Sequence, residues 1–174
     1  ARAMDLTDIR NLRKWYRQAA INGRDAGYDI IYVYAGHCMT TLMHFMLSRY
    51  NHRSDEYGGS IENRVRLTRE ILEEVKDAVG DQCGIAFRFA VDELLGKDGM
   101  TSEGEAQDVV GMLAEIPDLW DVNISGWAQD SSTARFEPLE GYQEKYTSFV
   151  KSMTTKPVVG VGRFTSADAM VSQI

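Results

Sequence analysis

The sequence predicts an α/β fold that forms part of a (β/α)8 TIM barrel, on three observations. Apolar strands alternate with amphipathic helices, no hairpin signal such as Asn-Gly joins two strands, and the two faces of the strands differ in polarity. Alternation without hairpins gives the order βαβαβαβ, and therefore parallel strands joined by right-handed crossovers. We expect residues 1–174 to form one partial barrel domain.

The first helix is predicted from Thr7 to about Ala26. Apolar residues recur there at helical spacing behind a candidate N-cap at Thr7 and stop before Gly27. The strand that follows, Tyr28 to Ala35, carries apolar side chains on both faces. This pattern is typical of a parallel strand that is covered on both sides.

The same alternation continues to the end of the chain. We expect helices over 60–79, 101–116 and 141–153, strands over 84–90, 119–127 and 157–163, and a last helix capped by Thr165 or Ser166. Four strands are too few, because a barrel filled by its own side chains needs about eight. The chain starts at Ala1 and stops at Ile174 inside a predicted helix, so we expect an excerpt of a longer protein.

A doubly wound sheet would have the same order of elements, but the strand faces favour the barrel. Small or polar residues alternate with apolar ones: Gly84, Ala86 and Arg88 with Ile85, Phe87 and Phe89, and Asp121, Asn123 and Ser125 with Trp120, Val122 and Ile124. In a barrel the outward face meets the helices, while the inward face leads to the active site at the carboxyl ends of the strands. Polar residues on the inward face are therefore candidate functional residues.

Composition excludes several classes of protein. The chain is 44% hydrophobic with a formal charge of −7, and 19 Lys+Arg against 26 Asp+Glu argue against nucleic acid as a partner. No apolar run approaches the roughly 20 residues that span a bilayer, so no membrane partner is expected. Cys38 and Cys83 lack CxxC spacing, and His44 and His52 lack metal-ligand spacing, so we expect neither disulfides nor a metal site. A reducing, cytoplasmic setting fits this cysteine content.

Four segments together carry a family resemblance. They are Tyr34-Ala35-Gly36-His37, the polar loop Asn51–Arg64, Arg88 on the next strand, and Gly160-Val161-Gly162-Arg163. With them the chain resembles the FMN-dependent old yellow enzyme superfamily, and most closely its trimethylamine, dimethylamine and histamine dehydrogenase family. The resemblance covers essentially the whole chain, and it implies barrel strands four to seven and FMN as the cofactor.

Arg88 is the strongest single candidate for cofactor binding. A guanidinium at an inward-facing position near the end of a strand must pair with an anionic or strongly accepting group. By resemblance that group is the N1 and C2 carbonyl edge of the flavin, where a fixed positive charge stabilises the anionic reduced form. The alternative is an arginine paired to a barrel carboxylate such as Asp121.

Gly162 and Arg163 are candidate ligands of the FMN phosphate. They lie between a strand and a helix start, where backbone N–H groups bind phosphate, and the resemblance assigns them to that site. As a bare pattern the signal is weak, because a glycine that merely ends a strand is at least as common.

The resemblance further assigns Tyr34, His37 and Asp130 to catalysis and Trp127 to the wall of the amine pocket. The three catalytic residues would tune one another's protonation and keep the substrate amine unprotonated. The Trp127 ring would attract a cationic or methylated amine by about 0.5–2 kcal/mol. Read without the motif, His37 is a loop residue that caps a backbone carbonyl.

Two departures from the wider superfamily point to amine oxidation. Tyr34 stands where ene-reductases have a histidine, and Met39 stands where they have a proton-donating tyrosine. Methionine has no proton to donate. The alternatives are an NAD(P)H-dependent ene or dienoyl reductase and an inactive barrel fragment.

The resemblance also implies features of a full-length protein. These are a small amine substrate, an electron-transfer acceptor protein, a homodimer, and a [4Fe-4S] cluster and ADP whose ligands lie outside this chain. The loop 53–64 is expected to be scaffold, with Ser60 as a helix cap and Gly58-Gly59 in the turn.

Overall fold

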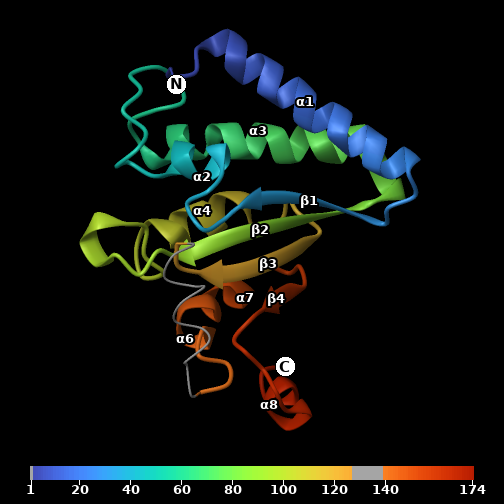
Figure 1. Cartoon of the computed structure of the whole chain (residues 1–174), viewed down its shortest axis with the longest axis vertical. Coiled ribbons are helices and arrows are strands. Elements are labelled where there is room, and N and C mark those ends of the chain that lie inside the picture. Colours follow the sequence, from blue (N-terminus) through green and yellow to red (C-terminus); the bar gives the residue numbers. More distant parts are fainter. Residues whose placement is uncertain (1, 127–138) are drawn as a thin grey trace.

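The computed structural model describes residues 2–126 and 139–174, and its centre is a parallel sheet in the order β1-β2-β3-β4 (Figure 1). Each strand pairs with the next one along the chain, as in a segment of a barrel. The strands are β1 Ile30–Ala35, β2 Gly84–Asp92, β3 Leu119–Ile124 and β4 Val158–Gly160. The predicted order of parallel strands is confirmed, although β3 and β4 are shorter than predicted.

Helices between the strands form a layer beside the sheet (Figure 1). Helix α1 packs on α3, α3 on α4, and α4 on α7, while α1 also contacts β1 and α3 contacts β2. The helices are α1 Leu6–Asp25, α2 Thr41–Met46, α3 Ile61–Val79, α4 Glu105–Leu113, α6 Glu144–Thr147, α7 Phe149–Met153 and α8 Ala167–Val171, with 3-10 turns η1 Gly80–Gln82 and η2 Gly96–Asp98.

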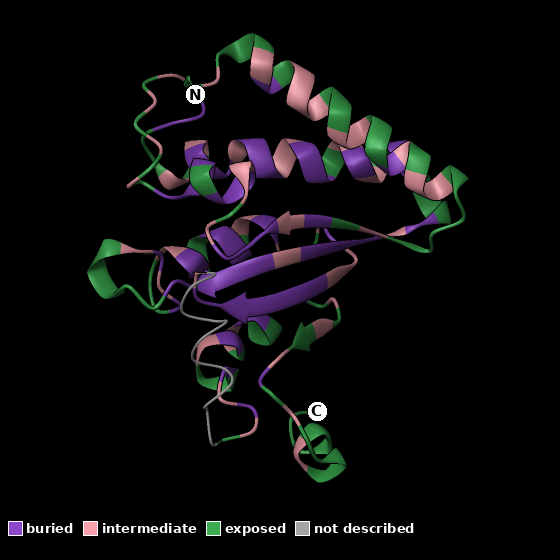
Figure 2. Cartoon of the chain, viewed as in Figure 1, coloured by how far each residue is buried: buried purple, intermediate pink, exposed green. Residues whose placement is uncertain are grey.

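The apolar strand faces predicted to meet the helices form the core (Figure 2). Phe87, Phe89 and Trp120 are fully buried. Phe87 stacks on Phe89 with ring centroids 5.7 Å apart and meets Trp120 edge-on at 5.3 Å. Each such aromatic pair contributes roughly 0.5–1.5 kcal/mol beyond the area it buries, so these rings fix β2 against β3.

The prediction that β1 is covered on both faces is wrong for the described part of the chain. Ile30 and Tyr32 are 47% and 52% exposed, while Val33 and Ala35 on the other face are buried. The helices cover one side of β1, and no described element covers the other side. An apolar residue pattern reports what a strand can bury, and it does not show whether a neighbour is there to bury it.

Two helix predictions need correction. Helix α1 is capped by Asp5 and not by Thr7, because the Asp5 carboxylate accepts from the N–H groups of Thr7 and Asp8 while Asp8 returns the bond in a capping box. The helix predicted over 141–153 is broken into α6 and α7 at Ser148.

Helix α2 was not predicted. Thr40 caps it by accepting from the N–H of Met43, and Met43 and Met46 pack into the core. Met39 precedes the helix and is 57% exposed.

The polar loop before α3 is scaffold, as predicted. Ser60 caps α3 by accepting from the N–H of Asn63, and Asn51 donates to the Phe45 and Tyr57 carbonyls at 2.6 and 2.7 Å. Gly58 lies so close to the Arg53 carbonyl oxygen that an added Cβ would be 2.2 Å from it. The loop therefore needs a glycine at position 58.

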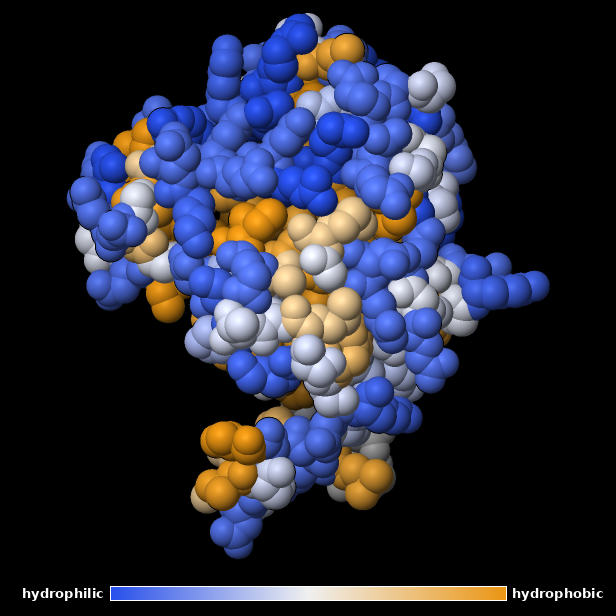
Figure 3. Space-filling model, turned by 180° about the vertical axis from the view of Figure 1, so that it is seen from behind, coloured by the Kyte–Doolittle hydropathy of each residue, from blue (hydrophilic) through white to orange (hydrophobic). Residues whose placement is uncertain are grey.

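Helix α8 extends away from the rest of the chain, and Figure 3 shows apolar atoms on its surface. Met170 and Val171 are 48% and 69% exposed. A cavity of about 590 Å³ lies between α8, α6 and β4. No helix among residues 2–126 and 139–174 is both long enough and apolar enough to cross a bilayer.

Candidate active site

The sheet register places three polar residues in one row. Tyr34 on β1 pairs with Arg88 on β2, and Arg88 pairs with Asp121 on β3. Residues paired in register point to the same side of a sheet. The row therefore lies on the face opposite the helices, which is the inward face predicted from the sequence.

Within this row Arg88 is fixed by the neighbouring strand. Its Nη1 donates to Asp121 Oδ2 at 2.8 Å, and the Asp121 side chain is 6% exposed. With the Asn123 amide turned so that its oxygen faces Arg88, that oxygen accepts from Nε at 3.0 Å and from Nη2 at 3.3 Å. The pairing with Asp121, considered as an alternative from the sequence, is present.

The pairing leaves Arg88 able to bind a ligand as well. A guanidinium has five N–H donors, and the bonds to Asp121 and Asn123 use three of them. The Arg88 side chain remains 32% exposed. Beside it, Asp121 Oδ1 is buried without a hydrogen-bond partner among the described residues. Donor N–H groups and a free acceptor thus point to a polar group on this face.

Tyr34 and His37 are brought together at the carboxyl end of β1. The Tyr34 hydroxyl lies 2.5 Å from His37 Nδ1, and His37 is 6% exposed. His37 also forms an isolated parallel bridge with Gly126 after β3. The pair predicted from the sequence therefore exists in this structure, in reach for a proton to move between oxygen and nitrogen.

The turn that carries His37 is strained. His37 and Cys38 both have φ 54°, the left-handed region that residues with a Cβ rarely adopt. Each such residue costs roughly 1–3 kcal/mol and persists where its surroundings hold it. Strained backbone conformations of this kind are concentrated at functional sites.

The candidate phosphate residues follow β4 at the same edge of the sheet. The Gly162 carbonyl accepts from the N–H of Gly141 at 2.9 Å, and a Cβ on Gly162 would be 2.8 Å from the Gly141 Cα. Close contact with Gly141 therefore explains the glycine at 162 in this structure. Arg163 is exposed, with φ 57°.

The carboxylate of Glu140 is hydrogen-bonded to the residues at the start of α8. The Glu140 carboxylate accepts from Thr165 Oγ1 and from the N–H and hydroxyl of Ser166, the last two at 3.1 Å. These bonds, with Thr165 contributing most, lower the pKa of Glu140 to about 2.

Trp127 and Asp130 lie outside the described residues, so their placement stays a prediction.

The sequence reading missed an ion pair beside His37. Arg49 Nη1 and Nη2 donate to the two carboxylate oxygens of Glu93 at 2.5 and 2.6 Å, and Nη2 also reaches Cys38 Sγ at 3.3 Å. Glu93 is 1% exposed, and its carboxylate is the main cause that raises the pKa of Arg49. The available signal was an acidic residue directly after β2, where barrel enzymes place functional groups.

The family model of the NADH:flavin oxidoreductase / NADH oxidase family matches residues 1–174. The chain belongs to this family. Dimethylamine dehydrogenase from Hyphomicrobium sp. (strain x) is 35% identical over 98% of this chain and 23% of its own length. The present chain therefore spans about a quarter of the length of this relative.

Two solved structures are similar in sequence and in fold. The 6-hydroxypseudooxynicotine amine oxidase from Pseudomonas geniculata N1 is 54% identical with a TM-score of 0.94, over 99% of this chain and 26% of that one. Histamine dehydrogenase from Rhizobium sp. 4-9 is 45% identical with a TM-score of 0.90, over 98% and 24%. The resemblance to amine dehydrogenases is confirmed.

The chain is also similar to proteins of the same family that are not named as amine dehydrogenases. NADPH dehydrogenase from Clostridium acetobutylicum is 29% identical over 89% of this chain and 44% of its own length. An old yellow enzyme homologue from Zymomonas mobilis, 22% identical with a TM-score of 0.75 over 99% of this chain and 47% of that one, shares the fold. The chain is therefore part of a (β/α)8 barrel.

The donor set fits the flavin named in the family description. Arg88 offers N–H groups to an accepting edge of a ring system, and Asp121 Oδ1 offers an acceptor to a ring N–H. Among the described residues no cluster of three or more His, Cys, Asp or Glu side chains forms a metal site.

Proposed function

We propose that this chain is the partial FMN-binding barrel of an amine dehydrogenase. The full-length enzyme would oxidise a secondary, tertiary or biogenic amine to an imine, which hydrolyses to an aldehyde and a smaller amine. The observation that carries the proposal is the contact of His37 with Tyr34, the residue that pairs with Arg88 in the sheet register. The amine-oxidising relatives named above support it.

The cofactor residues would be Arg88, Gly162 and Arg163. Bound FMN supplies the electron sink that accepts two electrons from the carbon next to the amine nitrogen. Arg88, oriented by Asp121, would present a positive charge to the flavin edge on which negative charge develops during reduction. Gly162 and Arg163 would bind the phosphate.

Tyr34 and His37 would act on the substrate proton. When His37 Nδ1 accepts from the Tyr34 hydroxyl, the imidazole proton lies on Nε2, and loss of that proton with a shift of the tyrosine proton to Nδ1 leaves a tyrosinate hydrogen-bonded across the 2.5 Å contact. The deprotonated pair would take up a proton at Nε2 from the ammonium form of the amine and leave the amine lone pair free. Asp130 would join this network, and Trp127 would wall the amine pocket.

A second candidate function is an NAD(P)H-dependent ene or dienoyl reductase. The similarity to an NADPH dehydrogenase favours it. Against it stand Tyr34 in place of a second carbonyl-polarising histidine and Met39, which cannot protonate a substrate. An inactive barrel fragment is the third candidate, and a full-length protein without a flavin spectrum would support it.

Steady-state turnover of the full-length protein tests the proposal. We expect at least one of dimethylamine, trimethylamine and histamine to reduce an artificial electron acceptor, with aldehyde as a product. Turnover with NADPH and an enone but with no amine would support the reductase instead. A [4Fe-4S] cluster, ADP, an acceptor protein, a homodimer and a cytoplasmic location belong to the same proposal for the full-length enzyme.

A further inference from the structure

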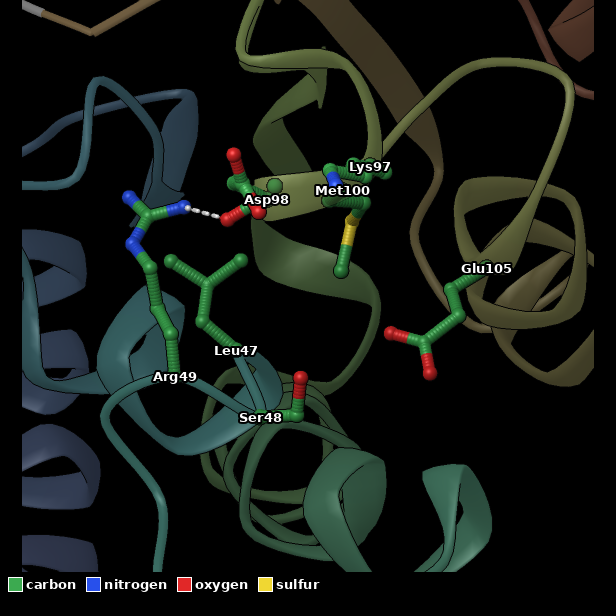
Figure 4. A pocket seen from close by; sticks show the side chains of 8 residues that line it. Leu47, Ser48, Arg49, Lys97, Asp98, Met100 and Glu105 are labelled. Atoms are coloured by element: carbon green, nitrogen blue, oxygen red, sulfur yellow. Dashed lines mark hydrogen bonds between the residues drawn. The ribbon is translucent and has the colours of Figure 1, made fainter.

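The ion pair of Arg49 and Glu93 connects two loops at the carboxyl edge of the sheet. Arg49 follows α2, and Glu93 follows β2. Besides the two bonds from Arg49, the Glu93 carboxylate accepts from the N–H of Met100 at 2.9 Å. Figure 4 shows Arg49 next to Asp98, whose carbonyl accepts from Nη1 at 3.3 Å. The Arg49 guanidinium is thus fixed from several sides.

This fixed guanidinium touches the turn that carries His37. Arg49 Nη2 donates to Cys38 Sγ at 3.3 Å, and Cys38 is the residue after His37. In addition, His44 Nε2 lies 3.0 Å from the Cys38 carbonyl oxygen. The left-handed backbone of His37 and Cys38 is therefore held through the Cys38 side chain and the Cys38 carbonyl.

We propose that Arg49, locked by Glu93, is a positioning residue that holds His37 at its short distance from Tyr34. The proposal rests on the function proposed above, because the contact matters only if Tyr34 and His37 share a proton. A left-handed pair of residues with side chains relaxes unless its surroundings fix it. Release of Cys38 lets the turn relax, and the ring of His37 moves away from Tyr34.

The obvious competing role for the pair is stability alone. Replacing Glu93 would leave the Arg49 cation and the N–H of Met100 without their carboxylate partner, and breaking such a pair is strongly destabilising, so the change would harm folding in either case. A cavity of about 380 Å³ beside Arg49, lined also by Lys97, Asp98 and Glu105, belongs to no assigned site. Nothing among the described residues indicates a ligand there, and the role proposed here does not depend on one.

Substitutions at Cys38 separate the two roles because they leave the ion pair intact. Cys38→Ala removes the acceptor that Arg49 touches, and Cys38→Ser keeps an acceptor. In full-length enzyme we expect Cys38→Ala to lower the limiting rate of flavin reduction by amine about tenfold to 100-fold with little change in KM, as a misplaced catalytic group does. The pKa seen in the pH profile of that rate should shift as well. Cys38→Ser should restore both towards wild type.

A matched control is the ion pair between helices α1 and α3, in which Arg13 Nε donates to Glu74 Oε1 at 2.9 Å. Glu74→Gln should lower stability without moving the pH profile. If Cys38→Ala leaves the rate and the pH profile at wild-type values, or if Glu74→Gln shifts the profile as much, Arg49 has no positioning role.

Crystal structures of the full-length variants keep this test separate from that of the function. We expect the distance between Tyr34 Oη and His37 Nδ1, 2.5 Å here, to lengthen by more than the coordinate error in Cys38→Ala and to recover in Cys38→Ser. An unchanged distance in Cys38→Ala would overturn the positioning role. If no amine reduces the wild-type flavin, the proposed function fails. A longer distance between Tyr34 Oη and His37 Nδ1 in Cys38→Ala would still support the positioning role of Arg49.

Discussion

The guanidinium of Arg88 donates to the carboxylate of Asp121 across two neighbouring strands, at 2.8 Å. The two residues stand in register on the inward face, so the contact follows directly from the pairing of β2 with β3. An internal partner and a flavin partner are compatible, since Asp121 and Asn123 together use three of the five donors. Asp121 orients Arg88 and also offsets its charge.

Asp121→Asn in the full-length enzyme should raise the midpoint potential of the flavin. The change removes a negative charge beside Arg88, so the anionic reduced flavin gains stability. We expect a rise of about 30 mV or more, since about 30 mV corresponds to a tenfold change in the equilibrium constant of a two-electron reduction. Potentiometric titration measures it. Arg88→Ala should move the potential the other way or weaken FMN binding, and unchanged potentials in both variants would remove Arg88 from the flavin site.

Tyr34→Phe should slow amine oxidation without loss of flavin. The variant keeps the ring but removes the hydroxyl that lies 2.5 Å from His37 Nδ1. Because a positioned acid or base contributes about 100-fold or more, we expect a fall of that order in the limiting rate of flavin reduction and a displaced pH profile. Stopped-flow spectroscopy between pH 6 and 10 gives both. A wild-type profile in Tyr34→Phe would show that the pair carries no proton.

The start of α8 should loosen in acid. The pKa of Glu140 is lowered from 4.5 to about 2, so its bonds to Thr165 and Ser166 stabilise the folded form above pH 4.5 and are lost as the pH falls towards 2. Hydrogen exchange of residues 165–172, corrected for the intrinsic rate, should rise a few-fold over this range. Glu140→Gln should show the faster exchange at neutral pH, and identical exchange in variant and wild type would contradict the assignment.

Gly58→Ala should destabilise the protein. The new Cβ would lie 2.2 Å from the Arg53 carbonyl oxygen, and relieving such a clash costs about 1–3 kcal/mol. Gly111→Ala is the matched control: it lies within α4, and its Cβ would meet Met153 Cε at 3.4 Å. Alanine within a helix is better than glycine by roughly 0.5–1 kcal/mol. Urea denaturation should separate the two variants, and equal midpoints would be inconsistent with the packing of the loop.

Much of this fold could be predicted from local patterns that are recognisable in the sequence. Strand order follows from the alternation of strands and helices, and the helix-facing core of Phe87 and Trp120 follows from the alternation of residues along each strand. The pairing of Tyr34 with His37 was expected from the family resemblance. Helix α2 was missed because six residues are too few for a helical period to show. The partners Arg49 and Glu93 stand 44 residues apart, and only the fold brings them together.

The exposure of the inward face of β1 could not be predicted from the sequence pattern either. Ile30 and Tyr32 are apolar or aromatic, and they predict burial, yet both are about half exposed in the described residues. Burial depends on which elements lie opposite a strand, and a pattern within the strand contains no information about them. The same limit applies to Asp121, whose free Oδ1 shows only in three dimensions.

The measurement that tests the central claim most directly is anaerobic stopped-flow reduction of the flavin in the full-length enzyme. Separate shots would contain histamine, dimethylamine, trimethylamine or NADPH. The account predicts that one of the amines bleaches the oxidised flavin rapidly and to completion, and that NADPH does so far more slowly. Rapid reduction by NADPH together with no reduction by any of the amines would contradict it.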